Sequence, residues 1–323
     1  PSAHTSPQTS TEASPMFDFD ELDELLPECR AKGGRSWCER TLGGVTCQVL
    51  PSLGSDRPEL VVLFFHGSGE PWRIEQKQLF SAERVRRLGD RVCIVLPASP
   101  MSHGSIHYWY SSDGAIIAEL LQKAKLEASN TSTMDPGSGN QHEAVSNAAV
   151  VQASPLEMLK DGEPMLLDVS RGVALGLVAA LSAELGVPAE RVVLGGFSQG
   201  AAVAMDCALH LLPQVPAAIG FFSGSLMCTK RWRACFESAG QHVQDALREV
   251  PLVQGHGRGD WAVGVNGGRW LHSFCVDDLG MRRCHYDEFQ GGHNIPDVVA
   301  DRFVALLADL VAGVQSDPSS GGS

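Results

Sequence analysis

Residues 191–204 read RVVLGGFSQGAAVA, the most informative stretch of the chain. It opens with a β-branched apolar run, typical of a buried strand, and closes with small residues that suit a helix. Between them stands a Gly-x-Ser-x-Gly sequence, Gly196 to Gly200. A serine on such a strand–turn–helix connection adopts a strained backbone, and glycines flank it because a Cβ there would clash. We therefore expect Ser198 to be a nucleophile; the alternative is an ordinary glycine-rich turn with an incidental serine.

Short apolar runs bounded by glycine or proline alternate along the chain with helical patterns. The expected strands are 60–65, 92–96, 192–194, 217–222, 251–253 and 282–289, and the clearest helices are 165–185, 201–212 and 299–314. Strands that alternate with helices predict a mainly parallel central sheet with helices on both faces. In such sheets, functional sites form at the carboxyl ends of the strands.

The bulk composition excludes several classes of protein. A formal net charge of −13 argues against a nucleic-acid partner. The nine cysteines form no Cys-x-x-Cys pair, so a zinc site is not expected, and we interpret the cysteines as reduced and the location as cytoplasmic. No apolar run is long enough to span a membrane.

One large domain accounts for most of the chain. Residues 1–26 are expected to be a disordered or weakly ordered N-terminal segment, because they begin with a Ser/Thr/Pro-rich stretch. A single domain is expected over 27–315, with a low-complexity surface insertion at about 127–161 and a flexible tail at 316–323.

A nucleophilic serine needs a base and a group that orients the base, and after an elbow of this kind the acid and then the histidine follow in the chain. His293 lies on a loop after the strand 282–289, whereas His272 falls in an expected helix and His285 in a strand. Asp260 is the aspartate that directly follows an expected strand. The alternatives are that His293 is an exposed loop histidine and that Asp260 caps the next helix.

An oxyanion needs two N–H donors. One is expected from Gln199, directly after the serine, and the other from Ser68 in the turn His66-Gly67-Ser68-Gly69. His66 is interpreted as structural, with its ring tied to the loop backbone. We expect no metal site and no cofactor.

Together these residues resemble the acyl-protein thioesterase, carboxylesterase and lysophospholipase family of α/β hydrolases. The motifs that carry the resemblance are Phe65-His66-Gly67-Ser68-Gly69, Gly195 to Gly200, His256-Gly257-x-x-Asp260, Gly292-His293, Leu96 to Pro100 and Trp109-Tyr110. The resemblance covers roughly 58–314 and implies the α/β-hydrolase fold.

The resemblance also implies hydrolysis of acyl thioesters on proteins, or of carboxylic esters and lysophospholipids, by a Ser-His-Asp triad without a cofactor. Matching loops would be 70–79 and 101–109, and the mouth of the site is expected to be lined by Trp72, Leu79, Ile106, Tyr108 and Trp109. The alternative is that these residues close the core beneath the loops.

Three departures from the family pattern stand out. Arg258 occupies a position where the family usually has a second aspartate, Val263-Gly264 replaces a usual Val-Pro, and the insertion is foreign to the compact family core. Arg258 raises the question of whether a cation perturbs Asp260 or draws it away from His293.

The leading functional hypothesis is an acyl-protein thioesterase or carboxylesterase. Its partners would be S-acylated proteins or small acyl esters, with transient contact to a membrane surface. The alternatives are a small-ester or lysophospholipid hydrolase and, in a different class, a non-catalytic scaffold of the same fold that binds a ligand or partner.

Overall fold

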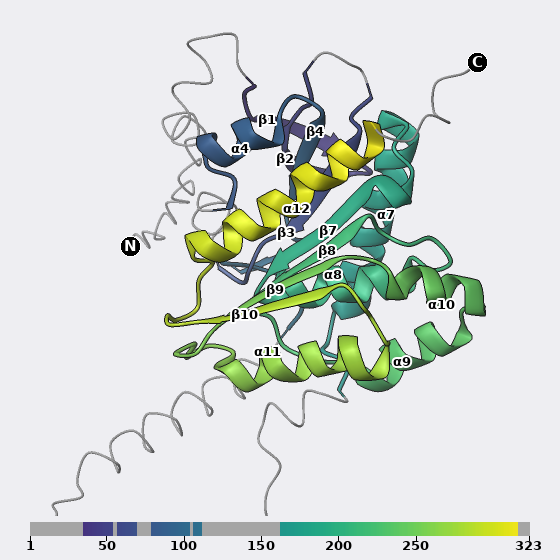
Figure 1. The fold of residues 1–323 in the computed structure, drawn as a ribbon, viewed down its shortest axis with the longest axis vertical. Helices are drawn as coiled ribbons and strands as arrows, with labels where there is room; N and C mark the ends of the chain where they lie inside the picture. Colours follow the sequence, from purple (N-terminus) through teal and green to yellow (C-terminus); the bar gives the residue numbers. More distant parts are fainter. Residues whose placement is uncertain (1–34, 54–56, 70–78, 104–105, 112–161, 316–323) are drawn as a thin grey trace, which may run out of the picture.

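A computed structural model describes residues 35–53, 57–69, 79–103, 106–111 and 162–315 (Figure 1). The expected N-terminal segment, insertion and tail all lie outside these ranges, so those expectations stay untested.

An eight-stranded sheet forms the centre of the molecule, in the order β1-β2-β4-β3-β7-β8-β9-β10. Its strands are β1 (Cys38–Leu42), β2 (Val45–Leu50), β3 (Leu60–Phe65), β4 (Val92–Pro97), β7 (Val192–Phe197), β8 (Ala218–Phe222), β9 (Leu252–Gly257) and β10 (Cys284–Phe289). Strand β2 pairs antiparallel with both β1 and β4, and the pairs from β4 through β10 are parallel. The sheet is mainly parallel, as expected.

The expected strands are present with shifted ends, and β1 and β2 were not anticipated. β3, β4, β7 and β8 are buried along their whole length, so they read as continuous apolar runs. β1 has the sequence CERTL and is largely exposed, so it lacks that signal. The segment 101–109, expected as a loop, instead contains a small separate hairpin of β5 (Met101–His103) and β6 (Ile106–Tyr108).

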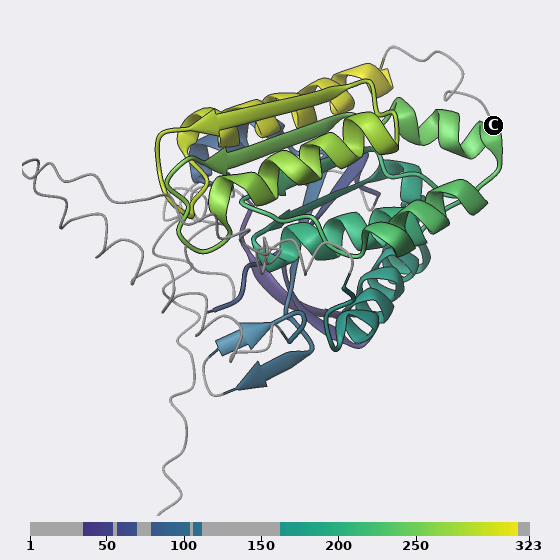
Figure 2. The ribbon, with the colours of Figure 1, turned by 90° about the horizontal axis from the view of Figure 1, so that it is seen from below.

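Helices cover both faces of the sheet (Figures 1 and 2). On one face α4 (Ala82–Leu88) packs against α12 (Asp297–Gln315). The other face carries α7 (Leu167–Leu185), α8 (Gln199–His210), α9 (Thr229–Ser238), α10 (Gln241–Arg248) and α11 (Gly264–Ser273). Two short turns complete the set: η1 (Ala189–Arg191) before β7, and the π-helical turn η2 (Phe274–Asp278) after α11.

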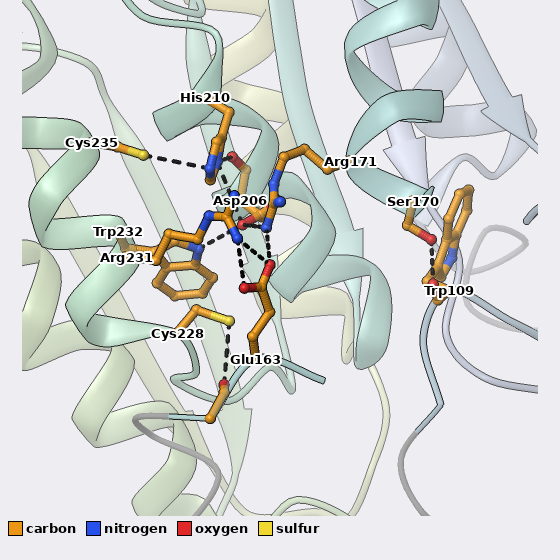
Figure 3. A network of polar contacts seen from close by, with 11 residues as sticks. Trp109, Glu163, Ser170, Arg171, Asp206, His210, Cys228, Arg231, Trp232 and Cys235 are labelled. Carbon is orange, nitrogen blue, oxygen red and sulfur yellow. Dashed lines mark hydrogen bonds and ion pairs between the residues drawn. The ribbon is translucent and has the colours of Figure 1, made fainter. Parts of the chain in front are cut away.

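Helix α8 is buried from Gln199 to Leu209, so it can carry a charged residue only with partners. That residue is Asp206, whose side chain is 1% exposed. It accepts hydrogen bonds from Arg171 Nε of α7 at 2.6 Å and from Trp232 Nε1 of α9 at 2.8 Å (Figure 3). Glu163 bridges Arg171 and Arg231 at the edge of this network. The network ties α7 and α9 to α8, the helix that follows Ser198.

Candidate active site

Ser198 is the connecting residue between β7 and α8. Its backbone, at φ 54° and ψ −118°, lies in a region that side chains rarely adopt. The flanking glycines leave no room for a side chain: a Cβ would lie 2.1 Å from the Gly200 carbonyl oxygen if added to Gly196, and 2.1 Å from the Phe65 carbonyl oxygen if added to Gly200. The Ser198 N–H donates to the Phe222 carbonyl at 2.8 Å. The strained strand–turn–helix geometry expected for a nucleophile is therefore present.

His293 and Asp260 lie side by side, on the loops that follow β10 and β9. His293 Nδ1 is 2.7 Å from Asp260 Oδ2. Asp260 Oδ1 accepts hydrogen bonds from the backbone N–H groups of Ala262 at 2.9 Å and Val263 at 3.0 Å. The His293 ring packs on the ring of Phe197, with centroids 4.7 Å apart. Since Phe197 directly precedes Ser198, the histidine stands beside the elbow with its Nδ1 directed to the acid.

Backbone contacts hold the two loops together. The Arg258 N–H donates to the Phe289 carbonyl at 2.9 Å, and the Gly259 N–H donates to the Gly291 carbonyl at 2.8 Å. A Cβ added to Gly257 would lie 2.2 Å from the Gly292 carbonyl oxygen. The two loops are therefore in backbone contact with no room for a side chain at position 257, and this contact fixes the separation of Asp260 and His293.

Asp260 is held in its charged form. Burial alone would raise the pKa of this carboxyl group, but the nearby His256 ring and the hydrogen bonds to His293 and the Val263 N–H outweigh burial and hold the pKa well below its ordinary value. His256, at the end of β9, is fully buried, and its Nε2 lies 3.3 Å from Asp260 Oδ2. A permanent carboxylate can fix the tautomer of His293 and stabilise its protonated form.

Arg258 does not draw Asp260 away. Its side chain is 55% exposed, and its Nε lies 3.4 Å from Glu288 Oε2. Glu288 also receives Arg269 Nε at 2.6 Å. The cation that replaces the usual second aspartate therefore pairs with β10 on the surface, and the bond from His293 to Asp260 is intact.

The turn after β3 lies against the elbow. A Cβ added to Gly67 would be 3.2 Å from the Cβ of Ser198. Gly69 and His107 exchange both backbone hydrogen bonds, at 2.9 and 2.7 Å, which anchors the turn to β6. Ser68, between these two glycines, is exposed. The backbone of residues 67–69 is thus placed beside Ser198, where the expected donor from Ser68 would be needed.

Gln199 is the first residue of α8, and its side chain holds the backbone of Trp109 and Tyr110. Its Oε1 accepts from the Trp109 N–H at 3.0 Å, and its Nε2 donates to the Tyr110 carbonyl at 3.1 Å. The Trp109 carbonyl accepts from Ser170 of α7. The N–H groups of a first helical turn have no partner within the helix, so the Gln199 N–H suits a developing negative charge.

His66 has the structural surroundings expected of it. Its Nδ1 lies 2.6 Å from the Gly67 carbonyl oxygen, and its Nε2 accepts from the Ser99 N–H at 3.2 Å. Burial lowers the pKa of His66 to about 4. The neutral ring therefore braces the turn that carries Ser68.

Two of the residues expected at the mouth of the site are instead in the core. Leu79 and Trp109 are each 0% exposed, and the Trp109 Nε1–H donates to the His66 carbonyl at 2.8 Å. Their apolar side chains and their place in or next to loops predicted lining residues, but the structure shows that they close the core beneath those loops. Ile106 is 53% exposed and Tyr108 is half-buried, whereas Trp72 lies outside the described residues.

Sequence reasoning missed Trp261. This residue directly follows Asp260, it is 73% exposed, and its ring centroid is 6.5 Å from that of His293. The sequence does place a tryptophan directly after the candidate acid, in the pair Asp260-Trp261. It does not show that this tryptophan is exposed or that it lies beside His293.

Over the described residues, no three His, Cys, Asp or Glu side chains gather into a set that could hold a metal ion. None of the helices described has the length and apolar character that crossing a membrane requires.

Comparison with known proteins supports the resemblance. Residues 176–303 match the family model described as phospholipase/carboxylesterase, a range that contains Ser198, Asp260 and His293. Two relatives are each named acyl-protein thioesterase 1. The protein from Eremothecium gossypii is 32% identical over 39% of this chain and 51% of its own length, and that from Debaryomyces hansenii is 30% identical over 32% and 41%. The chain thus matches about half of these relatives' length.

Solved structures share the fold. The crystal structure of esterase PE8 superposes with a TM-score of 0.58 at 22% identity, covering 82% of this chain and 99% of that one. Acyl-protein thioesterase 2 of Zea mays gives 0.51 at 16% identity, covering 81% and 98%. The chain therefore has the α/β-hydrolase fold, and the resemblance to the phospholipase/carboxylesterase family is confirmed.

Proposed function

We propose that this protein is a serine hydrolase that cleaves acyl thioesters or carboxylic esters, of the acyl-protein thioesterase or carboxylesterase type. The observation that carries the proposal is the 2.7 Å bond between His293 and Asp260 beside a serine in strained elbow geometry. This combination of an elbow serine, a histidine and a carboxylate with a depressed pKa suits nucleophilic acyl transfer.

In the proposed reaction, Ser198 Oγ attacks the acyl carbonyl and its proton passes to His293 Nε2. The carbonyl oxygen becomes an oxyanion, stabilised by the N–H groups of Gln199 and Ser68. The bond to the leaving thiol or alcohol then breaks, and the leaving group departs with the proton from His293. Water repeats the sequence on the acyl-enzyme, which releases the acid and restores Ser198.

The substrate class rests on relatives and on chemistry. Two relatives carry the name acyl-protein thioesterase, which favours S-acylated proteins as substrates. The exposed Ile106 and the half-buried Tyr108 offer apolar surface for an acyl chain. Small acyl esters and lysophospholipids are the alternative substrates. A scaffold without activity is disfavoured because the candidate triad residues are present, with the acid and base in contact.

The proposal includes a cytoplasmic location. The eight cysteines in the described part of the chain are all free, which suits a reducing compartment. Transient contact with a membrane surface would bring the enzyme to lipidated proteins.

Two measurements test the proposed function. A fluorophosphonate probe should label the parent protein and leave Ser198→Ala unlabelled. The value of kcat/KM for acyl thioesters and matched oxygen esters should then rise from two-carbon to at least eight-carbon chains, by roughly tenfold for each two carbons until the apolar surface ends. A steady fall with chain length would favour the small-ester hydrolase, and labelling of Ser198→Ala would refute the nucleophile.

A further inference from the structure

Two aromatic rings flank His293, and they have opposite surroundings. Phe197 is 2% exposed and packs on the histidine from the interior, at 4.7 Å between centroids. Trp261 lies 6.5 Å from the histidine and is 73% exposed. Phe197 is part of the core, whereas Trp261 presents most of its indole to solvent beside the candidate base.

Packing within the protein does not account for a tryptophan at position 261. Asp260 and Ala262, on either side of it, are held by the hydrogen bonds that orient the carboxylate. A large apolar side chain contributes to stability by burial, and Trp261 buries little. Asp260 and its backbone donors need nothing from the indole, so a ligand that covers it would explain the residue better.

The acyl oxygen and the leaving group of the substrate must lie against different elements of the protein. The acyl oxygen must lie against the turn 67–69 and the start of α8, where the oxyanion donors are placed. The leaving group must lie next to His293, because it departs with the proton from Nε2. Trp261 belongs to the loop that holds Asp260 against His293, not to either oxyanion element. We therefore expect the leaving group to lie next to Trp261.

We propose that Trp261 is a specificity residue for the leaving group, which stacks on its exposed indole and selects thiols or alcohols with a bulky apolar or aromatic substituent near the scissile bond. This inference rests on the proposed function and names its leaving-group preference. The leaving group is in the site only during the acylation step: the bond from Ser198 Oγ to the acyl carbon forms, the C–S or C–O bond breaks, the leaving atom takes the proton that His293 received from Ser198, and the acyl group stays on the serine. Trp261 therefore affects acylation and not the hydrolysis of the acyl-enzyme.

The test uses butyryl thioesters of ethanethiol, butanethiol, hexanethiol and 2-phenylethanethiol, which have one acyl group and thiols of similar acidity. For the parent, kcat/KM should rise with thiol size. Trp261→Ala should reduce the preference for 2-phenylethanethiol over ethanethiol by about tenfold, which is ~1.4 kcal/mol. Trp261→Phe should restore most of that preference. The hydrolysis rate of the butyryl-enzyme, followed in a single turnover, should be the same in all three proteins.

The matched control is Val276→Ala, which removes an exposed apolar side chain in η2, at the other end of the helical stretch that starts with α11. It should leave the leaving-group preference unchanged. An equal loss for all four thioesters, with slower hydrolysis of the acyl-enzyme, would show that Trp261 instead orders Asp260 and would overturn the inference. So would an unaltered preference in Trp261→Ala. Absence of Ser198-dependent turnover in the parent would overturn the proposed function as well.

Discussion

Replacing Asp206 by asparagine should destabilise the fold by an amount that the structure allows to be estimated. The carboxylate is 1% exposed and accepts from Arg171 Nε at 2.6 Å, Arg171 Nη2 at 3.1 Å and Trp232 Nε1 at 2.8 Å. An amide cannot accept all of these bonds, and it leaves the charge of a buried arginine without its main partner. Breaking a buried ion pair costs about 3–5 kcal/mol.

Glu163 keeps one contact to Arg171, at 3.0 Å, so the lower end of that range applies. A loss of about 3 kcal/mol lowers the melting temperature of a domain of this size by roughly 6–12 °C. The assay is thermal unfolding by circular dichroism at pH 7 and 0.15 M salt, with a urea titration for the free energy of unfolding.

The control is Asp278→Asn, which breaks the exposed pair of Arg233 and Asp278, with side chains 42% and 39% exposed. Such a pair contributes at most about 1 kcal/mol. A melting temperature for Asp206→Asn within about 2 °C of the parent protein would correspond to a loss of less than about 1 kcal/mol and would refute the reasoning. An equal loss of stability in both variants would refute it as well.

Four further predictions concern the candidate site. Ser198→Ala or His293→Ala should lower kcat by roughly 10³-fold or more, and the double variant should cost no more than either alone, because the two groups act as a unit; additive losses would contradict this. Asp260→Asn should lower kcat by about 10⁴-fold through the wrong histidine tautomer while circular dichroism stays native, and a loss below tenfold would argue against its role. Gly200→Ala should prevent folding or lower the melting temperature sharply, because its Cβ meets a carbonyl oxygen at 2.1 Å, whereas Gly172→Ala in α7, with open space around it, should be tolerated. Burial lowers the pKa of His66 from 6.5 to about 4, so its contribution to stability is complete above pH 6.5 and is lost as the pH falls toward 4. That loss is on the order of 3 kcal/mol; His66→Asn should flatten the dependence of the unfolding free energy on pH over this range, and an unchanged slope would disprove the assignment.

Local sequence was enough to predict the elbow. The apolar run of β7, the serine and the small residues of α8 are neighbours in the chain, and the sharp turn at Ser198 joins them directly. The buried strands could also be predicted, since a strand covered on both faces is apolar at every position. Exposed β1 has no such signal and was missed.

The assembly of the site needed contacts between distant segments. Chain order and loop position suggested Asp260 and His293, but their 2.7 Å contact depends on backbone bonds between the ends of β9 and β10. Because Arg258 is two residues before Asp260 in the chain, the sequence suggested that it could disturb this carboxylate. The structure explains why it does not, since Arg258 pairs with Glu288 on β10.

Burial was decided by tertiary structure alone. Trp109 and Trp261 are both tryptophans next to candidate site segments, yet the first is 0% exposed and the second 73%. Trp109 is covered by Phe65 and the His66 ring, from a strand more than forty residues earlier, while no comparable surface packs over Trp261 among the described residues. Backbone geometry at a turn follows from adjacent residues, whereas the exposure of a side chain depends on which distant surface packs against it, and a pattern of neighbours does not contain that information.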